Sequence, residues 1–210
     1  MNITDPRIVE YIQRITPAPD EILQEMAALA EKRSFPCIGP QVGRLLYALV
    51  KMTGARRIFE FGSGFGYSLY WMAKAAPDDA LLIGTEYDKD NVLAAADFFR
   101  RGGIDHQAQV WHGDGIEIFK SLSGEFDLIV NDAEKKQYPE IFTLGAPRLK
   151  IGGVFVSDNV LRRGEVVEPS SDPSTKAIQE YNELMFSDER FFSVILPIRD
   201  GISISIKQQD

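Results

Sequence analysis

Apolar residues recur at helical spacing through the first fifty residues of the chain. The stretches IVEYIQRI (8–15) and EILQEMAALAEK (21–32) place an apolar side chain every three or four positions, and TPAP separates them. A third stretch, QVGRLLYALVKM (41–52), stops just before Gly54, and glycine is the residue that best ends a helix. The pattern therefore predicts an N-terminal helical segment over residues 1–50.

Short apolar runs alternate with amphipathic stretches over the rest of the chain. The runs predict strands at 56–61, 80–86, 108–113, 126–132, 152–159, 191–198 and 202–207. The stretches between them predict helices at 67–76, 89–103, 115–122, 138–149 and 174–188. Repeated strand–helix units are typical of an α/β fold with a mostly parallel, seven-stranded sheet and helices on both faces. The last two runs are joined by a tight turn, which predicts one antiparallel strand in the edge region.

Composition and charge fit one globular domain. A chain of 210 residues with 44% hydrophobic and 26% charged residues has enough apolar mass for a single core, so we expect one domain, with residues 56–210 as its α/β part. A net charge of −8 without a basic run argues against a nucleic-acid partner.

The single cysteine, Cys37, excludes an internal disulfide and a zinc site built on several thiolates. We find no signal peptide or membrane-length apolar stretch, and expect a cytoplasmic protein without a membrane partner.

A glycine-rich turn, EFGSGFGYS (60–68), joins the first predicted strand to the following helix. Its glycines have the spacing G-x-G-x-G, whereas a dinucleotide site needs G-x-G-x-x-G, and Tyr67 stands at the third-glycine position. No GK[ST] follows, which excludes a phosphate-binding P-loop. Glu60 would repel a pyrophosphate and attract an ammonium group, and Glu86, ending the next strand, can accept hydrogen bonds from two ribose hydroxyls. A ligand with an amino acid at one end and an adenosine at the other fits these charges.

Two further strand ends carry oxygen ligands. Asp132 ends one strand, and Asp158 and Asn159 end the next. Two carboxylates and an amide carbonyl form a hard donor set that suits Mg²⁺ or Ca²⁺ better than zinc. The alternative is purely structural, with Asp132 capping a helix and Asp158–Asn159 making a turn.

The motif EFGSGFGYS resembles the first motif of the class I methyltransferases that use S-adenosylmethionine (SAM). Two later motifs, NDAEKKQY and SDNVL, narrow the resemblance to the cation-dependent O-methyltransferases of the catechol and caffeoyl-CoA type. The resemblance extends from about Pro36 to Lys207. It implies a Rossmann-like class I methyltransferase fold and methyl transfer from SAM to a hydroxyl of a small catechol-like or phenolic acceptor. It also implies a homodimer and a divalent cation, Mg²⁺ ahead of Ca²⁺ or Mn²⁺.

The resemblance also assigns roles to individual residues. Lys135 would be the catalytic base or charge stabiliser, and Asp132, Asp158 and Asn159 would bind the metal. The expected cofactor contacts are Ile38, Glu60, Gly62, Gly64, Tyr67, Ser68, Glu86, Asp114 and Asp132. For two of these a structural role remains open: Asp114 suits the N-cap of the helix that follows it, and Ile38 suits the core.

One departure from the family pattern concerns the acceptor. Arg162 stands where members usually have a tryptophan. An arginine there could bind an anionic group on the acceptor, or it could point into solvent. Two rival functions also remain at this point: a SAM-binding protein of the same fold without catechol activity, and a nicotinamide-dependent oxidoreductase, which the glycine spacing disfavours.

Overall fold

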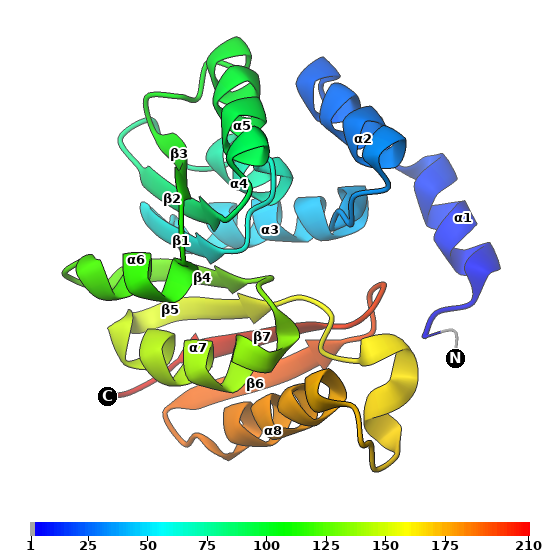
Figure 1. Cartoon of the computed structure of the whole chain (residues 1–210), viewed down its shortest axis with the longest axis vertical. Helices are drawn as coiled ribbons and strands as arrows, with labels where there is room; N and C mark the ends of the chain where they lie inside the picture. Colours follow the sequence, from blue (N-terminus) through cyan, green and yellow to red (C-terminus); the bar gives the residue numbers. More distant parts are fainter. Residues whose placement is uncertain (1–2) are drawn as a thin grey trace. The chain divides into compact units, whose positions relative to one another are not determined.

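The computed structural model describes residues 3–210 and follows the predicted alternation of helices and strands (Figure 1). The N-terminal helices are α1 (Pro6–Ile15), α2 (Glu21–Arg33) and α3 (Gly39–Thr53). The alternating part contains β1 (Arg57–Phe61), α4 (Tyr67–Ala73), β2 (Leu81–Glu86), α5 (Lys89–Arg101), β3 (Ala108–His112), α6 (Gly115–Ser121), β4 (Phe126–Asn131), α7 (Tyr138–Gly145) and β5 (Leu149–Ser157). The chain then forms α8 (Pro173–Ser187), β6 (Phe191–Leu196) and β7 (Ile202–Lys207). Every helix and strand expected from the sequence is present, with ends shifted by a few residues.

Short 3₁₀ helices are the elements that the sequence pattern did not predict. Within residues 3–210 they are η1 (Lys135–Gln137), η2 (Ala146–Arg148) and η3 (Arg162–Val167). The third occupies the loop after β5 and contains three consecutive residues with a positive φ, Arg162, Arg163 and Gly164. In the same described part of the chain, no helix is both long and apolar enough to cross a membrane.

The seven strands form one sheet in the order β3-β2-β1-β4-β5-β7-β6, which confirms the predicted α/β fold. β1 pairs with β2, and β2 with β3, in parallel. β7 runs antiparallel to both of its neighbours, β5 and β6. The predicted antiparallel strand is therefore present, and it lies one place in from the edge, which β6 forms. By contacts between residues, the chain divides into two compact units, Pro19–Val130 and the pair of segments Met1–Ala18 with Asn131–Asp210.

The unit Pro19–Val130 is built on β1, a strand with four of its five residues buried. β1 is followed by β2 and β3 on one side and by β4 on the other. Because parallel connections are right-handed, this reversal places α4 and α5 on one face of the sheet and α6 on the opposite face. Phe59 anchors an aromatic cluster, with ring centroids 4.7 Å from Phe61, 4.9 Å from Phe119 and 5.8 Å from Phe126.

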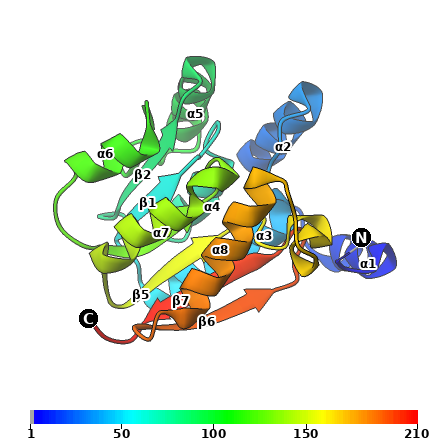
Figure 2. The same cartoon turned by 60° about the horizontal axis from the view of Figure 1, so that its bottom comes forward.

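The unit that contains Asn131–Asp210 packs α7 and α8 against each other (Figure 2). Tyr138 and Phe142 of α7 and Tyr181 of α8 are almost completely buried there. The Tyr181 hydroxyl lies 2.8 Å from Ser157 Oγ of β5 and 2.8 Å from Ser203 Oγ of β7. Hydroxyl groups thus join this helix to the two strands.

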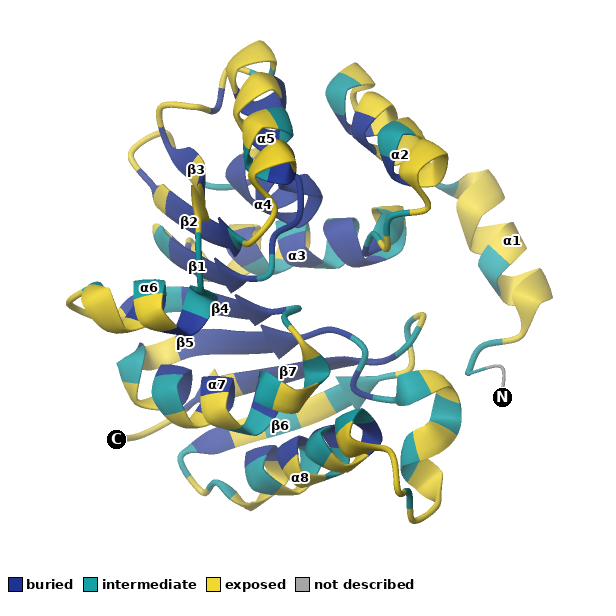
Figure 3. Ribbon diagram, in the orientation of Figure 1, coloured by how far each residue is buried: buried dark blue, intermediate teal, exposed yellow. Residues whose placement is uncertain are grey.

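Helix α1 differs from the other helices because none of its residues is buried (Figure 3). Asp5 caps its first turn by accepting a hydrogen bond from Arg7 N. Ile8, Tyr11 and Ile15 lie at helical spacing, and each exposes more than half of its surface. The helix therefore presents an apolar stripe that its own unit does not cover.

Candidate functional site

The glycine-rich turn between β1 and α4 adopts a conformation that side chains disfavour. Gly62, Gly64 and Gly66 have φ angles of 79°, 53° and 84°, in the left-handed region. Space is also restricted, because a Cβ on Gly64 would lie 2.7 Å from the Phe35 ring and one on Gly66 would lie 2.5 Å from the Phe99 ring. Both the backbone angles and the packing thus explain why this turn is rich in glycine.

Glu60, near the end of β1, holds the turn through a hydrogen bond with Ser63. Its side chain is 1% exposed, and its Oε2 accepts a hydrogen bond from Ser63 Oγ at 2.6 Å. Thr85 of β2 binds the same segment, since its Oγ1 donates to Glu60 O at 3.2 Å and accepts from Gly62 N at 3.3 Å. Ser63 and Thr85 were not expected from the sequence, although the serine stands only three residues after the acid.

Glu86 ends β2 beside the turn, as predicted. Its Oε1 accepts a hydrogen bond from Asp88 N at 2.8 Å, and its Oε2 lies 3.9 Å from the position that a Cβ of Gly64 would occupy. The structure therefore brings two expected cofactor residues together. This arrangement leaves the carboxylate at the strand end, where a ribose could bind it.

Asp114 is the N-cap of α6, which confirms the structural alternative. Its Oδ1 accepts hydrogen bonds from Ile116 N at 2.8 Å and Glu117 N at 3.1 Å. Its Oδ2 accepts one from Tyr87 Oη at 2.6 Å. The Tyr87 hydroxyl, and then the two amides, lower the pKa of the Asp114 carboxyl. A role toward the cofactor remains compatible with this geometry.

The other expected cofactor residues of this unit are buried around the turn. Tyr67 and Ser68 form the first turn of α4, directly after Gly66, and are 4% and 6% exposed. Ile38 is the N-cap residue of α3 and is 7% exposed, which places it in the core as well. Within the described chain, Gln41 Nε2 on the same helix is buried and has no hydrogen-bond partner.

The two strand ends that carry Asp132 and Asp158 adjoin. Asp158 N donates a hydrogen bond to Asn131 O at 3.1 Å, which joins the end of β5 to the end of β4. Asn159 has a left-handed φ of 59°, and its backbone N donates to Asp158 Oδ1 at 2.8 Å. The three predicted metal ligands therefore belong to one small region of a single unit.

Burial dominates the electrostatics of these two acids. Asp158 is 7% exposed, and burial, followed by the charge of Asp132, raises the pKa of its carboxyl to about 7. Burial also raises the pKa of the Asp132 carboxyl, against the opposing effect of Lys135. Arg199 lowers the pKa of both groups, but by less than burial raises it. Two neighbouring carboxylates are thus held where their negative charges are poorly compensated.

This donor set fits a hard divalent cation. Such an ion would neutralise both acids, and the amide oxygen of Asn159 is a ligand of the same chemical type. Among residues 3–210, no group of three or more histidine, cysteine, aspartate or glutamate side chains is arranged to bind a metal. The predicted set contains two such carboxylates, and its third member is an amide.

Lys135 lies beside Asp132 at the start of η1. Its Nζ lies 3.0 Å from Asp132 Oδ1, 3.3 Å from Ala133 O and 2.9 Å from Tyr138 Oη. Its side chain is 18% exposed. The Tyr138 hydroxyl in turn donates to Asp158 O at 2.8 Å. Burial is the main reason why the pKa of Tyr138 is raised well above its ordinary value. This tyrosine was not expected from the sequence, although its spacing of three residues from Lys135 was a usable signal.

Arg162 forms ion pairs within the chain, whereas the sequence suggested either contact with an anionic acceptor or exposure to solvent. Its guanidinium lies 3.3 Å from Asp172 Oδ2 and 3.6 Å from Glu165 Oε2, and its side chain is 27% exposed. Asp172 is also the N-cap of α8. Arg162 therefore joins the loop after β5 to that helix, and an anionic acceptor would have to compete with two carboxylates for it.

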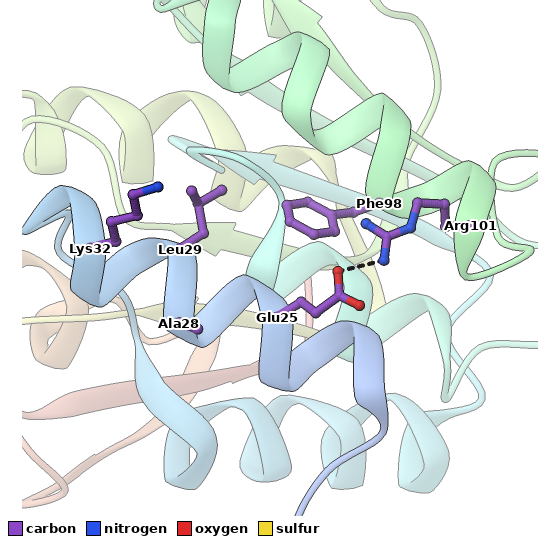
Figure 4. A pocket seen from close by; sticks show the side chains of 6 residues that line it. All are labelled: Glu25, Ala28, Leu29, Lys32, Phe98 and Arg101. Carbon is purple, nitrogen blue, oxygen red and sulfur yellow. Dashed lines mark hydrogen bonds and ion pairs between the residues drawn. The ribbon is translucent and has the colours of Figure 1, made fainter.

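A separate hollow of about 360 Å³ lies between α2 and α5 (Figure 4). It is lined by Glu25, Ala28, Leu29, Lys32, Phe98 and Arg101, none of which is an expected site residue. Arg101 and Glu25 form an ion pair across it. The hollow thus combines three apolar residues with three charged ones, two of which pair with each other.

Comparison with known proteins adds independent evidence. A family model described as O-methyltransferase matches residues 14–208. A catechol O-methyltransferase from Niastella koreensis is 32% identical over 199 residues, which cover 89% of this chain and 90% of that protein. A caffeoyl-CoA O-methyltransferase from Medicago sativa is 27% identical over 205 residues, covering 90% and 83%.

Solved structures agree with these relatives. An O-methyltransferase from Bacillus cereus, in complex with SAH, superimposes with a TM-score of 0.87 at 26% identity, over 96% of this chain and 97% of that one. One from Streptomyces achromogenes, in complex with SAM, gives a TM-score of 0.88 at 26% identity, over 97% and 96%. Similarity of this extent covers both units of the chain.

The close packing of the glycine turn generates a prediction. Gly66→Ala should lower the free energy of unfolding by about 2–4 kcal/mol, because it combines a left-handed φ with a clash against Phe99. Gly54→Ala is the matched control: its φ is 64°, but a Cβ there would meet nothing within 4 Å. It should cost only about 1 kcal/mol. Equal losses in urea unfolding would show that the ring packing against Gly66 is unimportant.

Proposed function

The chain belongs to the O-methyltransferase family, and we propose that it transfers a methyl group from SAM to a hydroxyl of a small, catechol-like acceptor with the help of a divalent cation. The observation that carries the proposal is the pair Asp158, which is buried, and Asp132, whose side chain is 26% exposed, with Lys135 Nζ 3.0 Å from Asp132 Oδ1. Two poorly compensated carboxylates beside a lysine suit a divalent cation, which would activate an acceptor hydroxyl.

The cofactor would be held by the residues around the glycine turn. Glu60 would attract the ammonium group of SAM, Glu86 would accept hydrogen bonds from its ribose hydroxyls, and the turn itself would let the ligand approach the backbone closely. Ile38, Gly62, Gly64, Tyr67, Ser68, Asp114 and Asp132 complete the proposed cofactor set. Its support is the clustering of the turn residues with Glu86, together with similar proteins that were solved with SAM or SAH.

The acceptor would be activated near Asp132, Asp158 and Asn159, the proposed ligands of Mg²⁺, Ca²⁺ or Mn²⁺. When bound, the cation would lower the pKa of an acceptor hydroxyl, as it does for bound water. Lys135 would take up the hydroxyl proton at Nζ or, as an ammonium, stabilise the phenolate. The hydroxyl oxygen would then attack the methyl carbon of SAM in line, forming an O–C bond as the C–S bond breaks, so that the sulfonium would become the thioether of SAH.

The competing functions differ in what they leave unexplained. A nicotinamide oxidoreductase would need the third glycine where Tyr67 stands, and the relatives are O-methyltransferases. A SAM-binding protein without catechol activity would retain the glycine turn, but it would have no use for the buried acids next to Lys135. We therefore favour the enzyme, and a methyl-transfer assay distinguishes the two.

Cofactor binding gives the first functional prediction. Glu86→Ala should weaken SAM binding by about 1–3 kcal/mol, the value of hydrogen bonds to a charged group. Asp90→Ala, which removes an exposed acid in the nearby first turn of α5, should leave the affinity unchanged. Isothermal titration calorimetry measures both. Unchanged affinity in folded Glu86→Ala protein would remove Glu86 from the cofactor site.

The metal gives the second prediction. Wild-type protein should methylate members of a catechol panel, lose this activity in EDTA and regain it when Mg²⁺ is added in excess. Asp158→Ala should abolish activity at any Mg²⁺ concentration, because one of the two carboxylates is gone. SAM affinity should stay within about twofold of wild type, a change below about 0.5 kcal/mol. Asp188→Ala, an acid of the same unit that pairs with Arg190, is the control and should remain active. Full activity after exhaustive chelation would contradict the metal mechanism.

The assembly is a further part of the proposal. We expect a homodimer in which the apolar stripe of α1 is covered, because no residue of that helix is buried within the chain. Ile8→Glu together with Ile15→Glu should then shift the protein from dimer to monomer in sedimentation velocity, while the matched change Glu10→Gln on the same helix should not. An unchanged dimer in the double variant would exclude α1 as the interface.

A further inference from the structure

Tyr138 occupies an unusual position between two groups of the proposed site. It is the first residue of α7, and its side chain is completely buried. Its hydroxyl donates to the backbone carbonyl of Asp158 at 2.8 Å, and Lys135 Nζ lies 2.9 Å from the same oxygen. A phenol carries one proton, and a carbonyl can only accept. The tyrosine oxygen must therefore be the acceptor in its bond with Lys135.

This arrangement fixes the end of the lysine side chain. An ammonium group has three donors, and Lys135 Nζ is within hydrogen-bond distance of three acceptors: Asp132 Oδ1, Ala133 O and Tyr138 Oη. Two of them lie within three residues of Lys135 on its N-terminal side. Of the three acceptors, Tyr138 is the one that connects Nζ to Asp158, the residue directly after β5, through the backbone carbonyl of Asp158.

We propose that Tyr138 is a positioning residue for methyl transfer, which holds Lys135 Nζ at a fixed place relative to the strand end that carries Asp158 and Asn159. The inference rests on the proposed function of Lys135. A lysine that assists proton removal has to lie at a defined distance from the reacting hydroxyl, and a misplacement of about 1 Å can cost 10²-fold in rate. A flexible four-carbon side chain does not supply this precision by itself.

Tyr181 provides a matched control for this hydroxyl. Its ring packs against that of Tyr138, with centroids 5.5 Å apart at 88°, and it is equally buried. Its hydroxyl bonds to Ser157, the residue directly before Asp158, and to Ser203. It therefore supports the same strand end and the same core. Its hydroxyl contacts Ser157, Ser203 and Met185 and not Lys135, so Tyr181→Phe removes a buried hydroxyl while keeping the lysine bond.

The kinetic test compares Tyr138→Phe with Tyr181→Phe. Both variants should fold and lose similar stability. Tyr138→Phe should lower kcat by roughly 10- to 100-fold, with KM for the acceptor and for SAM within about threefold of wild type. It should also change the ratio of the two monomethyl products of an asymmetric catechol, since Lys135 no longer favours one hydroxyl. Tyr181→Phe should keep both kcat and the product ratio within about twofold of wild type.

A second measurement does not depend on turnover. In protein labelled with ¹⁵N at lysine, the ammonium signal of Lys135 is identified by its loss in Lys135→Arg. Proton exchange at this signal should be at least about tenfold faster in Tyr138→Phe than in wild type or Tyr181→Phe. This factor corresponds to the loss of a hydrogen bond worth about 1.4 kcal/mol. Unchanged exchange in Tyr138→Phe would overturn the inference, and so would equal losses of kcat in the two variants. If wild type methylates no acceptor, the proposed function fails, and the exchange rates still decide whether Tyr138 holds Lys135.

Discussion

Two carboxyl groups near each other at adjoining strand ends set the main physical constraint on this protein. Burial raises the pKa of Asp158, which is buried, and of Asp132, which is partly buried, and the charge of Asp132 makes ionisation of Asp158 more costly still. A fold keeps such a pair only when other contacts determine its geometry and a positive charge compensates it. Lys135 supplies one such charge, and a divalent cation would supply the remainder.

The surroundings of the two acids follow from this constraint. Tyr138 and Tyr181 bind consecutive residues at the end of β5, one through a backbone carbonyl and the other through a serine hydroxyl. The turn between β6 and β7 supports the next segment, because Gly201 O and Asp200 O accept hydrogen bonds from Val160 N and Leu161 N. The end of β5 is therefore contacted from α7, α8 and the last hairpin.

The unit Pro19–Val130 also contains a buried acid whose position is determined by hydrogen bonds from its neighbours. Glu60 is also a buried acid, and its geometry is determined by Ser63 and by Thr85 of the neighbouring strand. The glycines keep side chains out of the space beside Phe35 and Phe99. A carboxylate held below a bare stretch of backbone suits a ligand that carries a positive charge and has to approach the main chain. The proposed function assigns methyl donation to this unit and hydroxyl activation to the unit that contains Asn131–Asp210.

Much of this organisation could be predicted from the sequence. Short apolar runs fixed the strands, and acids at their carboxyl ends indicated the candidate residues, because strand ends of a parallel sheet share one edge. Contacts of single side chains were harder to predict. Arg162 pairs with Asp172, ten residues away, and no periodic pattern links the two. The direction of the Tyr138 hydroxyl depends on the packing of α7 against α8, which only the folded chain defines. Asp114 could be assigned as a cap, since aspartate before a helix is a local signal.

Crystallography can test whether Asp132, Asp158 and Asn159 form a binding site for a divalent cation. Crystals grown with SAH and Mn²⁺ would be measured with X-rays at which manganese scatters anomalously. We predict one strong anomalous peak in contact with oxygen atoms of these three side chains, and none there in crystals of Asp158→Ala. A peak bound only by other residues, or no peak at saturating Mn²⁺, would contradict it.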